Sequence, residues 1–197
     1  MERVAGRRTD QLRPLTIEVD FLEQANGSAL ISLGRTRVLC TATLEEGVPR
    51  WLSGGGRGWM TAEYGMLPAS TGERTLWLDC DVLQADGGTR TAAISGVYVA
   101  ARRALDRLGL GRALAQPVAA VSAGIVEGTP LLDLDYEEDS TAEVDLNVVM
   151  TGDGRLVEVQ ATAERVPFVR AGLDRLLELG AFGIQRVVEA QREALGA

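Results

Sequence analysis

The sequence predicts an α+β protein in which a mixed β-sheet is covered by helices. Two pairs of β-prone runs, Ser28–Leu33 with Arg37–Thr43 and Ala142–Thr151 with Arg155–Thr162, are each joined by a short turn and are typical of hairpins. Between them, Thr91–Leu108 has apolar residues at helical spacing. Because strands and helices alternate irregularly, with several hairpins, a mixed sheet is favoured over a repeated βαβ pattern.

The first half of the chain is expected to be mostly strand. Gly34-Arg35-Thr36 is the turn of the first hairpin, and the glycine patch Gly54–Gly58 lacks the strand–turn–helix setting of a dinucleotide site, so we expect a flexible loop there. A strand over Thr75–Leu83 leads into the loop Gln84–Arg90, and the helix Thr91–Leu108 follows and ends before a glycine.

The second half is expected to begin with strands and to end with helices. Val118–Val126 is predicted to turn at a Glu-Gly pair and return through Leu131–Tyr136, and the second hairpin follows. The remainder is predicted to form two helices, Phe168–Leu179 and Gly183–Leu195, with a break near Gly180.

Length and composition favour one domain over residues 1–197. The chain has 197 residues, 46% of them hydrophobic, and shows no tandem repeat or interdomain linker. It contains neither His nor Lys, so all 20 basic residues are Arg. This excludes Ser–His and Cys–His nucleophile pairs, Schiff-base lysines and the Walker A loop. Any metal must be held by oxygen ligands, which favours Mg²⁺ or Mn²⁺ over zinc.

Charge and cysteine content bear on partners and on location. The net charge of −8 argues against nucleic acid as a partner, because phosphate binding needs a positive surface, although 20 arginines could still gather on one face. Cys40 and Cys80 lie in apolar, strand-like runs and are expected to be reduced thiols. No apolar stretch reaches the roughly 18 residues of a membrane span, so we expect no membrane partner and a cytoplasmic location.

The first candidate site is the loop Asp86–Arg90, between a predicted strand and a predicted helix. A helix start has unpaired N–H groups, two glycines allow close approach of an anion, and Thr89 and Arg90 add donors. These features indicate a phosphate site formed by Gly88, Thr89 and Arg90. The alternative is an ordinary glycine turn with Thr89 as helix N-cap and a solvated arginine, and the local residues favour neither.

The second candidate site is the acidic run Asp133–Asp139, followed by Glu143 and Asp145. A divalent cation would relieve the mutual repulsion of so many neighbouring carboxylates. Asp139 and Asp145 lie on either side of a turn of small residues, where they could converge on one ion. The alternative is a solvated acidic loop, the commoner fate of a charge run. Asp145 favours the metal site because apolar residues flank it in a strand.

A third segment, Trp59–Pro68, combines aromatic, acidic and glycine residues that could line a pocket. A core segment with one exposed glutamate is the favoured interpretation.

Several strings, in order along nearly the whole chain, resemble the ribonuclease PH family of phosphorolytic 3′–5′ exoribonucleases, which is related to polynucleotide phosphorylase and to exosome ring subunits. The matching strings are Asp10–Pro14, Gly27–Ser28, Thr36–Ala42, Gly58–Pro68, Asp79–Thr91, Leu132–Asp139, Asp145–Met150, Glu158–Gln160 and Thr162–Glu164. The resemblance implies a fold like the second domain of ribosomal protein S5 and a homo-oligomer, a hexameric ring built as a trimer of dimers.

The resemblance also implies a reaction and its residues. Inorganic phosphate attacks the 3′-terminal phosphodiester of RNA, such as a precursor tRNA tail, and a nucleoside diphosphate is released. Gly88, Thr89 and Arg90 match the phosphate-binding loop of the family. Asp139 and Asp145 match the acidic pair assigned to Mg²⁺ binding and to proton donation.

One departure from the family is large. After a string like Met66–Thr71, members continue for a few dozen residues through an Arg-rich loop, a Gly-Arg-Thr string and a helix. That stretch carries the family's second phosphate-binding arginine and many of its RNA-contacting arginines; here Thr71 is followed directly by Gly72. Arg74 is not a replacement, because its context places it at the start of the next strand. Ala161 also stands where the family usually has glycine.

Three functions are therefore weighed. A phosphorolytic exoribonuclease ranks first. A catalytically weakened or silent RNA-binding ring subunit is the alternative, because losing one charge-assisted phosphate contact weakens phosphate binding by about 10- to 100-fold. A Mg²⁺-dependent phosphohydrolase would use the acidic residues but leaves Thr89 and Arg90 less explained.

Overall fold

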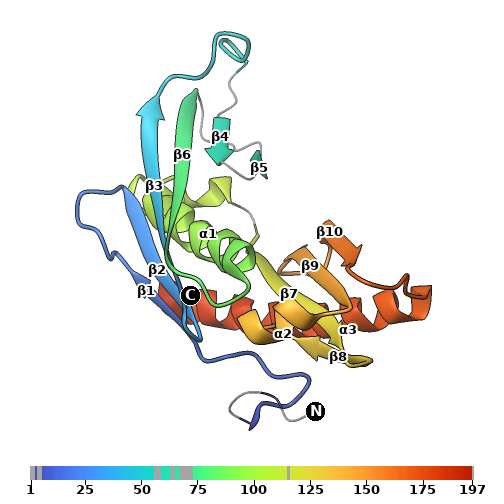
Figure 1. Ribbon diagram of the computed structural model, residues 1–197. Helices are drawn as coiled ribbons and strands as arrows, with labels where there is room; N and C mark the ends of the chain where they lie inside the picture. The colour runs from blue at the N-terminus through green and yellow to red at the C-terminus, as the bar shows by residue number, and fades with distance from the viewer. Residues whose placement is uncertain are drawn as a thin grey trace.

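The protein is described by a computed structural model that covers residue 3 and residues 6–55, 59–62, 65–66, 73–114 and 116–196 (Figure 1). One sheet has six strands in the order β1-β2-β3-β6-β4-β5, in which the β4–β6 pair is parallel and the other pairs are antiparallel. Its strands are β1 (Leu15–Val19), β2 (Gly27–Leu33), β3 (Thr36–Glu46), β4 (Trp59–Ala62), β5 (Gly65–Met66) and β6 (Arg74–Gln84). The predicted mixed sheet is confirmed.

The second sheet is antiparallel and has the order β10-β9-β7-β8. Its strands are β7 (Val118–Val126), β8 (Thr129–Leu132), β9 (Val144–Thr151) and β10 (Leu156–Ala163). The helices are α1 (Thr89–Arg107), the 3-10 turn η2 (Gly111–Ala113), α2 (Tyr136–Thr141) and α3 (Arg170–Leu195). Both predicted hairpins are present, as β2–β3 and β9–β10, and Arg74 begins β6 as expected.

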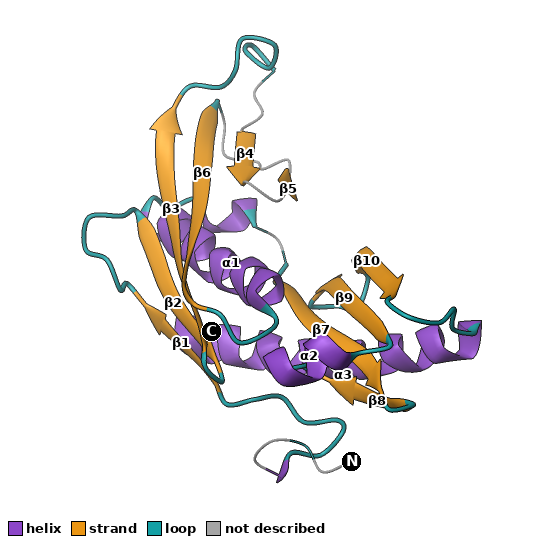
Figure 2. Cartoon of the chain, in the orientation of Figure 1, coloured by secondary structure: helices purple, strands orange, loops and turns teal. Residues whose placement is uncertain are grey.

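Figure 2 shows α1 between the two sheets and α3 beneath the second sheet. Helix α1 packs on β2 and β3 of the first sheet and on β7 of the second, while α3 runs under the second sheet and reaches β1. One apolar core lies between the first sheet and α1, and another lies between the second sheet and α3. Helix α1 joins the two sheets because its buried faces consist mainly of small residues.

Strand β9 separates core residues from candidate site residues by its alternation. Val144, Leu146 and Val148 are buried in the core that covers α3, whereas Asp145 and Asn147 are half-buried on the opposite face. The alternation of β9 therefore places Asp145 on the face of the sheet opposite this core.

The C-terminal helix differs from the prediction. The expected break near Gly180 is wrong, because α3 is one helix from Arg170 to Leu195. A Cβ atom at Gly180 would lie 2.5 Å from Val148 Cγ1, and one at Gly183 would lie 2.8 Å from Leu132 Cδ1. These glycines therefore allow the helix to approach the second sheet closely and do not interrupt it.

The predicted return strand is present as β8, paired antiparallel with β7, but its predicted extent to Tyr136 is wrong. Strand β8 ends at Leu132, and Asp133 has a positive φ of 55°. Asp135 then caps α2, which begins at Tyr136. The Asp135 side chain accepts from the N–H of Glu138, and the Glu138 side chain accepts from the N–H of Asp135, a capping box that favours helix over strand.

Some predictions fall outside the described residues. Part of the Gly54–Gly58 loop and the Thr71–Gly72 junction lie there, and so do Glu63, Tyr64, Leu67 and Pro68 of the third candidate segment. Met60 in that segment is buried in the core of the first sheet. Within the described part of the chain, no helix is both long and apolar enough to cross a membrane.

Candidate active site

The predicted loop Asp86–Arg90 lies between β6 and α1, but its last two residues, Thr89 and Arg90, already belong to the helix, which begins two residues before the predicted start at Thr91. Gly87 and Gly88 have φ values of 77° and 65°, in the left-handed region where glycine carries no steric penalty. Gly88 is the N-cap residue and has no side chain to cap the helix, while Thr89 is the first helical residue. The alternative in which Thr89 is the N-cap is therefore wrong.

The loop is held from one side by three residues that were not predicted to act on it. Thr36 Oγ1 accepts from the Asp86 N–H at 2.9 Å and donates to the Gly87 carbonyl at 2.7 Å. Arg13 donates to the carbonyls of Asp86 and Gly87, and Arg35 donates to the Asp86 carboxylate at 2.9 and 3.0 Å. The carbonyls of Asp86 and Gly87 thus accept hydrogen bonds from residues in the N-terminal part of the chain.

The helix start can receive an anion. The first backbone bond into α1 runs from the Ala92 N–H to the Gly88 carbonyl, at 3.0 Å. The N–H groups of Thr89, Arg90 and Thr91 precede that bond, where the positive end of the helix dipole favours negative charge. These N–H groups make the start of α1 a candidate anion site.

Arg90 is not the solvated side chain of the alternative interpretation. Its Nη2 donates to both carboxylate oxygens of Glu158, at 2.7 and 2.8 Å, and its Nη1 donates to Gln160 Oε1 at 2.8 Å. Both partners lie on β10, so Arg90 connects the start of α1 to the second sheet.

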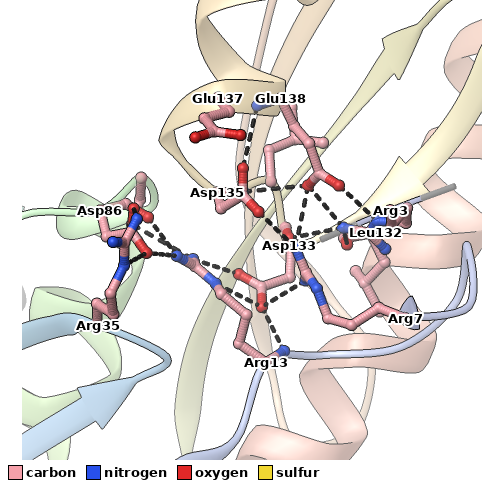
Figure 3. Close-up of polar contacts among 12 residues, drawn as sticks. Arg3, Arg7, Arg13, Arg35, Asp86, Leu132, Asp133, Asp135, Glu137 and Glu138 are labelled. Carbon is pink, nitrogen blue, oxygen red and sulfur yellow. Dashed lines mark hydrogen bonds and ion pairs between the residues drawn. The ribbon is translucent and has the colours of Figure 1, made fainter. Parts of the chain in front are cut away.

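The acidic run divides into buried and exposed members. Asp133, Asp135 and Glu138 are buried and paired with arginines of the N-terminal segment (Figure 3), so the solvated-loop alternative is wrong for them. We call this group the arginine–carboxylate cluster; it consists of Arg3, Arg7, Arg13, Asp133, Asp135 and Glu138. The shortest contacts are Arg3 to Glu138 at 2.8 Å, Arg7 to Glu138 at 3.1 Å, Arg7 to Asp135 at 3.2 Å, and Arg13 to Asp133 at 2.6 Å.

The arginine–carboxylate cluster positions both candidate sites. We call the segment Asp86–Gly88 before α1 the phosphate loop. Arg13 donates hydrogen bonds to Asp133 and to two carbonyls of the phosphate loop, so it connects that loop to the end of β8. Arg3 donates hydrogen bonds to both carboxylate oxygens of Glu138 and so holds α2, the helix that carries Asp139, in place. One local signal was available in the sequence, since Asp135 followed by Glu138 three residues later is a helix-capping pattern.

Asp139 and Asp145 line one pocket of about 400 Å³ at the end of α2. The pocket is lined by Asp139, Ser140, Ala142, Asp145, Glu164 and Arg165. Burial, followed by the charges of Asp139 and Glu164, raises the pKa of Asp145 to about 6. Desolvation and the charge of Glu164 also raise the pKa of Asp139. The two aspartates thus line the same pocket, and Glu164 and Arg165, which were not predicted to be there, line it too.

Both candidate sites lie on the same face of the second sheet. Asp145 is opposite Gly124 in the β7–β9 ladder, and the next same-face pair is Asn147 with Ser122. Asn147 Nδ2 donates to Asp145 Oδ2 at 3.3 Å. A Cβ atom at Gly88 would lie 3.6 Å from Ser122 Oγ, so the phosphate loop lies beside these residues.

The acidic pair fits a magnesium ion. Mg²⁺ commonly takes only one or two protein carboxylates and keeps several waters. Asp139 and Asp145 provide two carboxylates in one pocket, and burial, followed by neighbouring carboxylates, raises the pKa of each. Within the described ranges, no three His, Cys, Asp or Glu side chains are grouped to enclose a metal ion. The donor set therefore suits a hydrated ion with oxygen ligands.

Comparison with known proteins agrees with these features. The family models for the 3′ exoribonuclease family, domain 1 and domain 2, match residues 11–75 and 116–181. Ribonuclease PH of Parasynechococcus marenigrum is 46% identical over 234 residues, covering 98% of this chain and 94% of the relative. That aligned region is longer than the 197 residues here, in keeping with a segment that the relative has and this chain lacks.

Solved structures share the fold. Rice (Oryza sativa) Rrp46 superposes with a TM-score of 0.82 at 20% identity, covering 99% of this chain and all of the other. The Archaeoglobus fulgidus exosome with RNA bound to its active site gives 0.76 at 23% identity, covering 95% of this chain and 92% of that one. An archaeal exosome core gives 0.77 at 23% identity, with 97% and 91% covered.

Two family models that together span most of the chain, and a relative 46% identical along nearly all of it, lead to one conclusion: the chain belongs to the 3′ exoribonuclease family that includes ribonuclease PH.

Proposed function

We propose that this protein is a phosphate-dependent 3′–5′ exoribonuclease that shortens RNA from its 3′ end, including precursor tRNA tails, and releases nucleoside diphosphates. One observation carries the proposal: an anion site at the start of α1 and a carboxylate pair lie on the same face of the second sheet. The kinship with ribonuclease PH supports the same reaction.

In this mechanism the chain positions charges and takes no covalent part. Inorganic phosphate occupies the N–H groups at the start of α1, where Arg90 is the adjacent cation. Burial and the nearby carboxylates raise the pKa of Asp145 to about 6, so Asp145 can deliver a proton to the leaving 3′ oxygen when it is not bound to a metal ion. Mg²⁺ held by Asp139 and Asp145 would supply additional neutralisation of the phosphate charges.

The proposal is tested with RNA that has a single-stranded 3′ end. Shortening should require both inorganic phosphate and Mg²⁺, and chromatography should identify nucleoside diphosphates as the products. Nucleoside monophosphates formed in phosphate-free buffer would instead support the phosphohydrolase alternative. Binding of RNA without any turnover would support the catalytically silent subunit.

We further propose that copies of the chain assemble into a ring, a hexamer built as a trimer of dimers. Strand β10 is an edge strand with exposed apolar side chains at Leu156, Val157 and Val159. An unpaired strand edge with apolar residues favours association with another chain. The similar fold of an archaeal exosome core supports this assembly.

A further inference from the structure

Both terminal nitrogens of Arg90 already donate hydrogen bonds within the protein. Nη2 donates to both oxygens of Glu158, and Nη1 donates to Gln160. Arginine binds phosphate best through a fork of two parallel N–H groups, and each such fork includes at least one terminal nitrogen. A phosphate that arrives at α1 therefore finds the guanidinium engaged.

The ion pair between Arg90 and Glu158 can be broken readily. The side chains of Arg90 and Glu158 are 29% and 40% exposed, so water can replace either partner, and an ion pair of this exposure is weak. The buried pairs of the arginine–carboxylate cluster differ, because the Arg3 and Glu138 side chains are each 2% exposed. Arg90 is thus held by a contact that an incoming anion can break.

We propose that Glu158 is the internal counter-ion of Arg90 and sets the affinity of the enzyme for phosphate. The inference rests on the phosphate role proposed for Arg90 above. When no phosphate is bound, the Arg90 guanidinium donates to Glu158 on β10. When phosphate binds, it replaces Glu158 as the acceptor of these hydrogen bonds. Because Glu158 competes with phosphate for the same donors, removing its charge strengthens phosphate binding. Gln160, a neutral acceptor, holds the other nitrogen without neutralising the arginine.

The test compares the parent with Glu158→Gln, which keeps an acceptor oxygen but removes the charge. We expect KM for phosphate and the Kd of inorganic phosphate measured by calorimetry to fall about two- to five-fold, the range of an exposed ion pair. The change in kcat should be smaller than the change in KM. Glu158→Asp keeps the charge and should restore values near those of the parent.

The matched control is Glu189→Gln, which removes the carboxylate of the exposed Arg186–Glu189 pair on α3 and changes net charge equally. It should leave both constants unchanged. An unchanged or raised KM and Kd in Glu158→Gln would overturn the inference, as would phosphate binding to Arg90→Ala as tight as to the parent. If RNA is not phosphorolysed but Glu158→Gln still tightens phosphate binding, the proposed function fails and the inference stands.

Discussion

Asp145 is a carboxyl group in an environment that does not favour its charge. Its neighbours along β9 belong to the core, and burial with two nearby carboxylates raises its pKa to about 6. At neutral pH the charged form is therefore less favourable in the folded protein than in the unfolded chain. A side chain that lowers stability in this way is better explained by a chemical role than by packing.

Asp145→Asn should abolish phosphorolysis, by at least about 100-fold, because the charge and the transferable proton are lost. Since the folded-state pKa is raised, the parent loses stability as pH rises from the ordinary value of 3.8 to about 6. In metal-free buffer at pH 8 the variant should therefore be more stable by about 1–2 kcal/mol, after allowance for solvent screening. Below pH 4 the difference should disappear.

Thermal melts and phosphorolysis rates measure these effects, with Asp174→Asn on the exposed side of α3 as the matched control. Asp139→Asn should also lose activity, and added Mg²⁺ should partly restore it. Turnover by Asp145→Asn within a few-fold of the parent would show that the acidic pair is not the catalytic centre.

At the scale of single elements, α2 depends on its buried carboxylate. Burial alone raises the pKa of Glu138, but hydrogen bonds from Arg3 and the Asp135 N–H, with the charges of Arg3 and Arg7, lower it overall from its ordinary 4.5. The contribution of Glu138 to stability is therefore present above pH 4.5 and is lost as pH falls through the lowered folded-state value.

Glu138→Gln should destabilise the protein by about 3 kcal/mol at pH 7, because Arg3 stays buried after losing its partner charge. In a protein of this size that lowers Tm by about 6–12 °C. The difference from the parent should shrink below pH 4.5. Glu137→Gln, an exposed neighbour in the same turn, should stay within about 0.5 kcal/mol; an equal loss in both variants would contradict the assigned role.

Helix α3 depends on the closeness of its contact with the second sheet. Gly180→Ala places a Cβ atom 2.5 Å from Val148 Cγ1 and should cost about 1–3 kcal/mol in denaturant unfolding. Gly172→Ala, in the same helix, meets nothing closer than 3.5 Å and should be neutral or stabilising by up to about 1 kcal/mol. Equal effects would mean that α3 does not approach the sheet as described.

At the scale of the whole molecule, the exposed apolar edge of the second sheet and the family membership predict an oligomer, and a hexameric ring is the expected form. Light scattering at micromolar concentration should give a mass several times that of the 21.0 kDa chain. A monodisperse monomer under these conditions would refute the ring.

Much of the fold and of the candidate site could be predicted from local sequence. Hairpins, the glycine loop before α1 and the half-buried position of Asp145 follow from turn residues and from the alternation of strands, which act over a few residues. The convergence of Asp139 and Asp145 was also predictable, since only six positions separate them and a turn lies between.

The tertiary structure decided the contacts between distant residues. Arg3 and Glu138 are 135 positions apart, Arg13 and Asp133 are 120 apart, and Arg90 and Glu158 are 68 apart. Sequence periodicity cannot predict such pairs, because two charged residues far apart in the sequence form an ion pair only after packing has brought them together and excluded water. The continuity of α3 past Gly180 has the same origin: local propensity disfavours a glycine there, and close packing on the second sheet outweighs it.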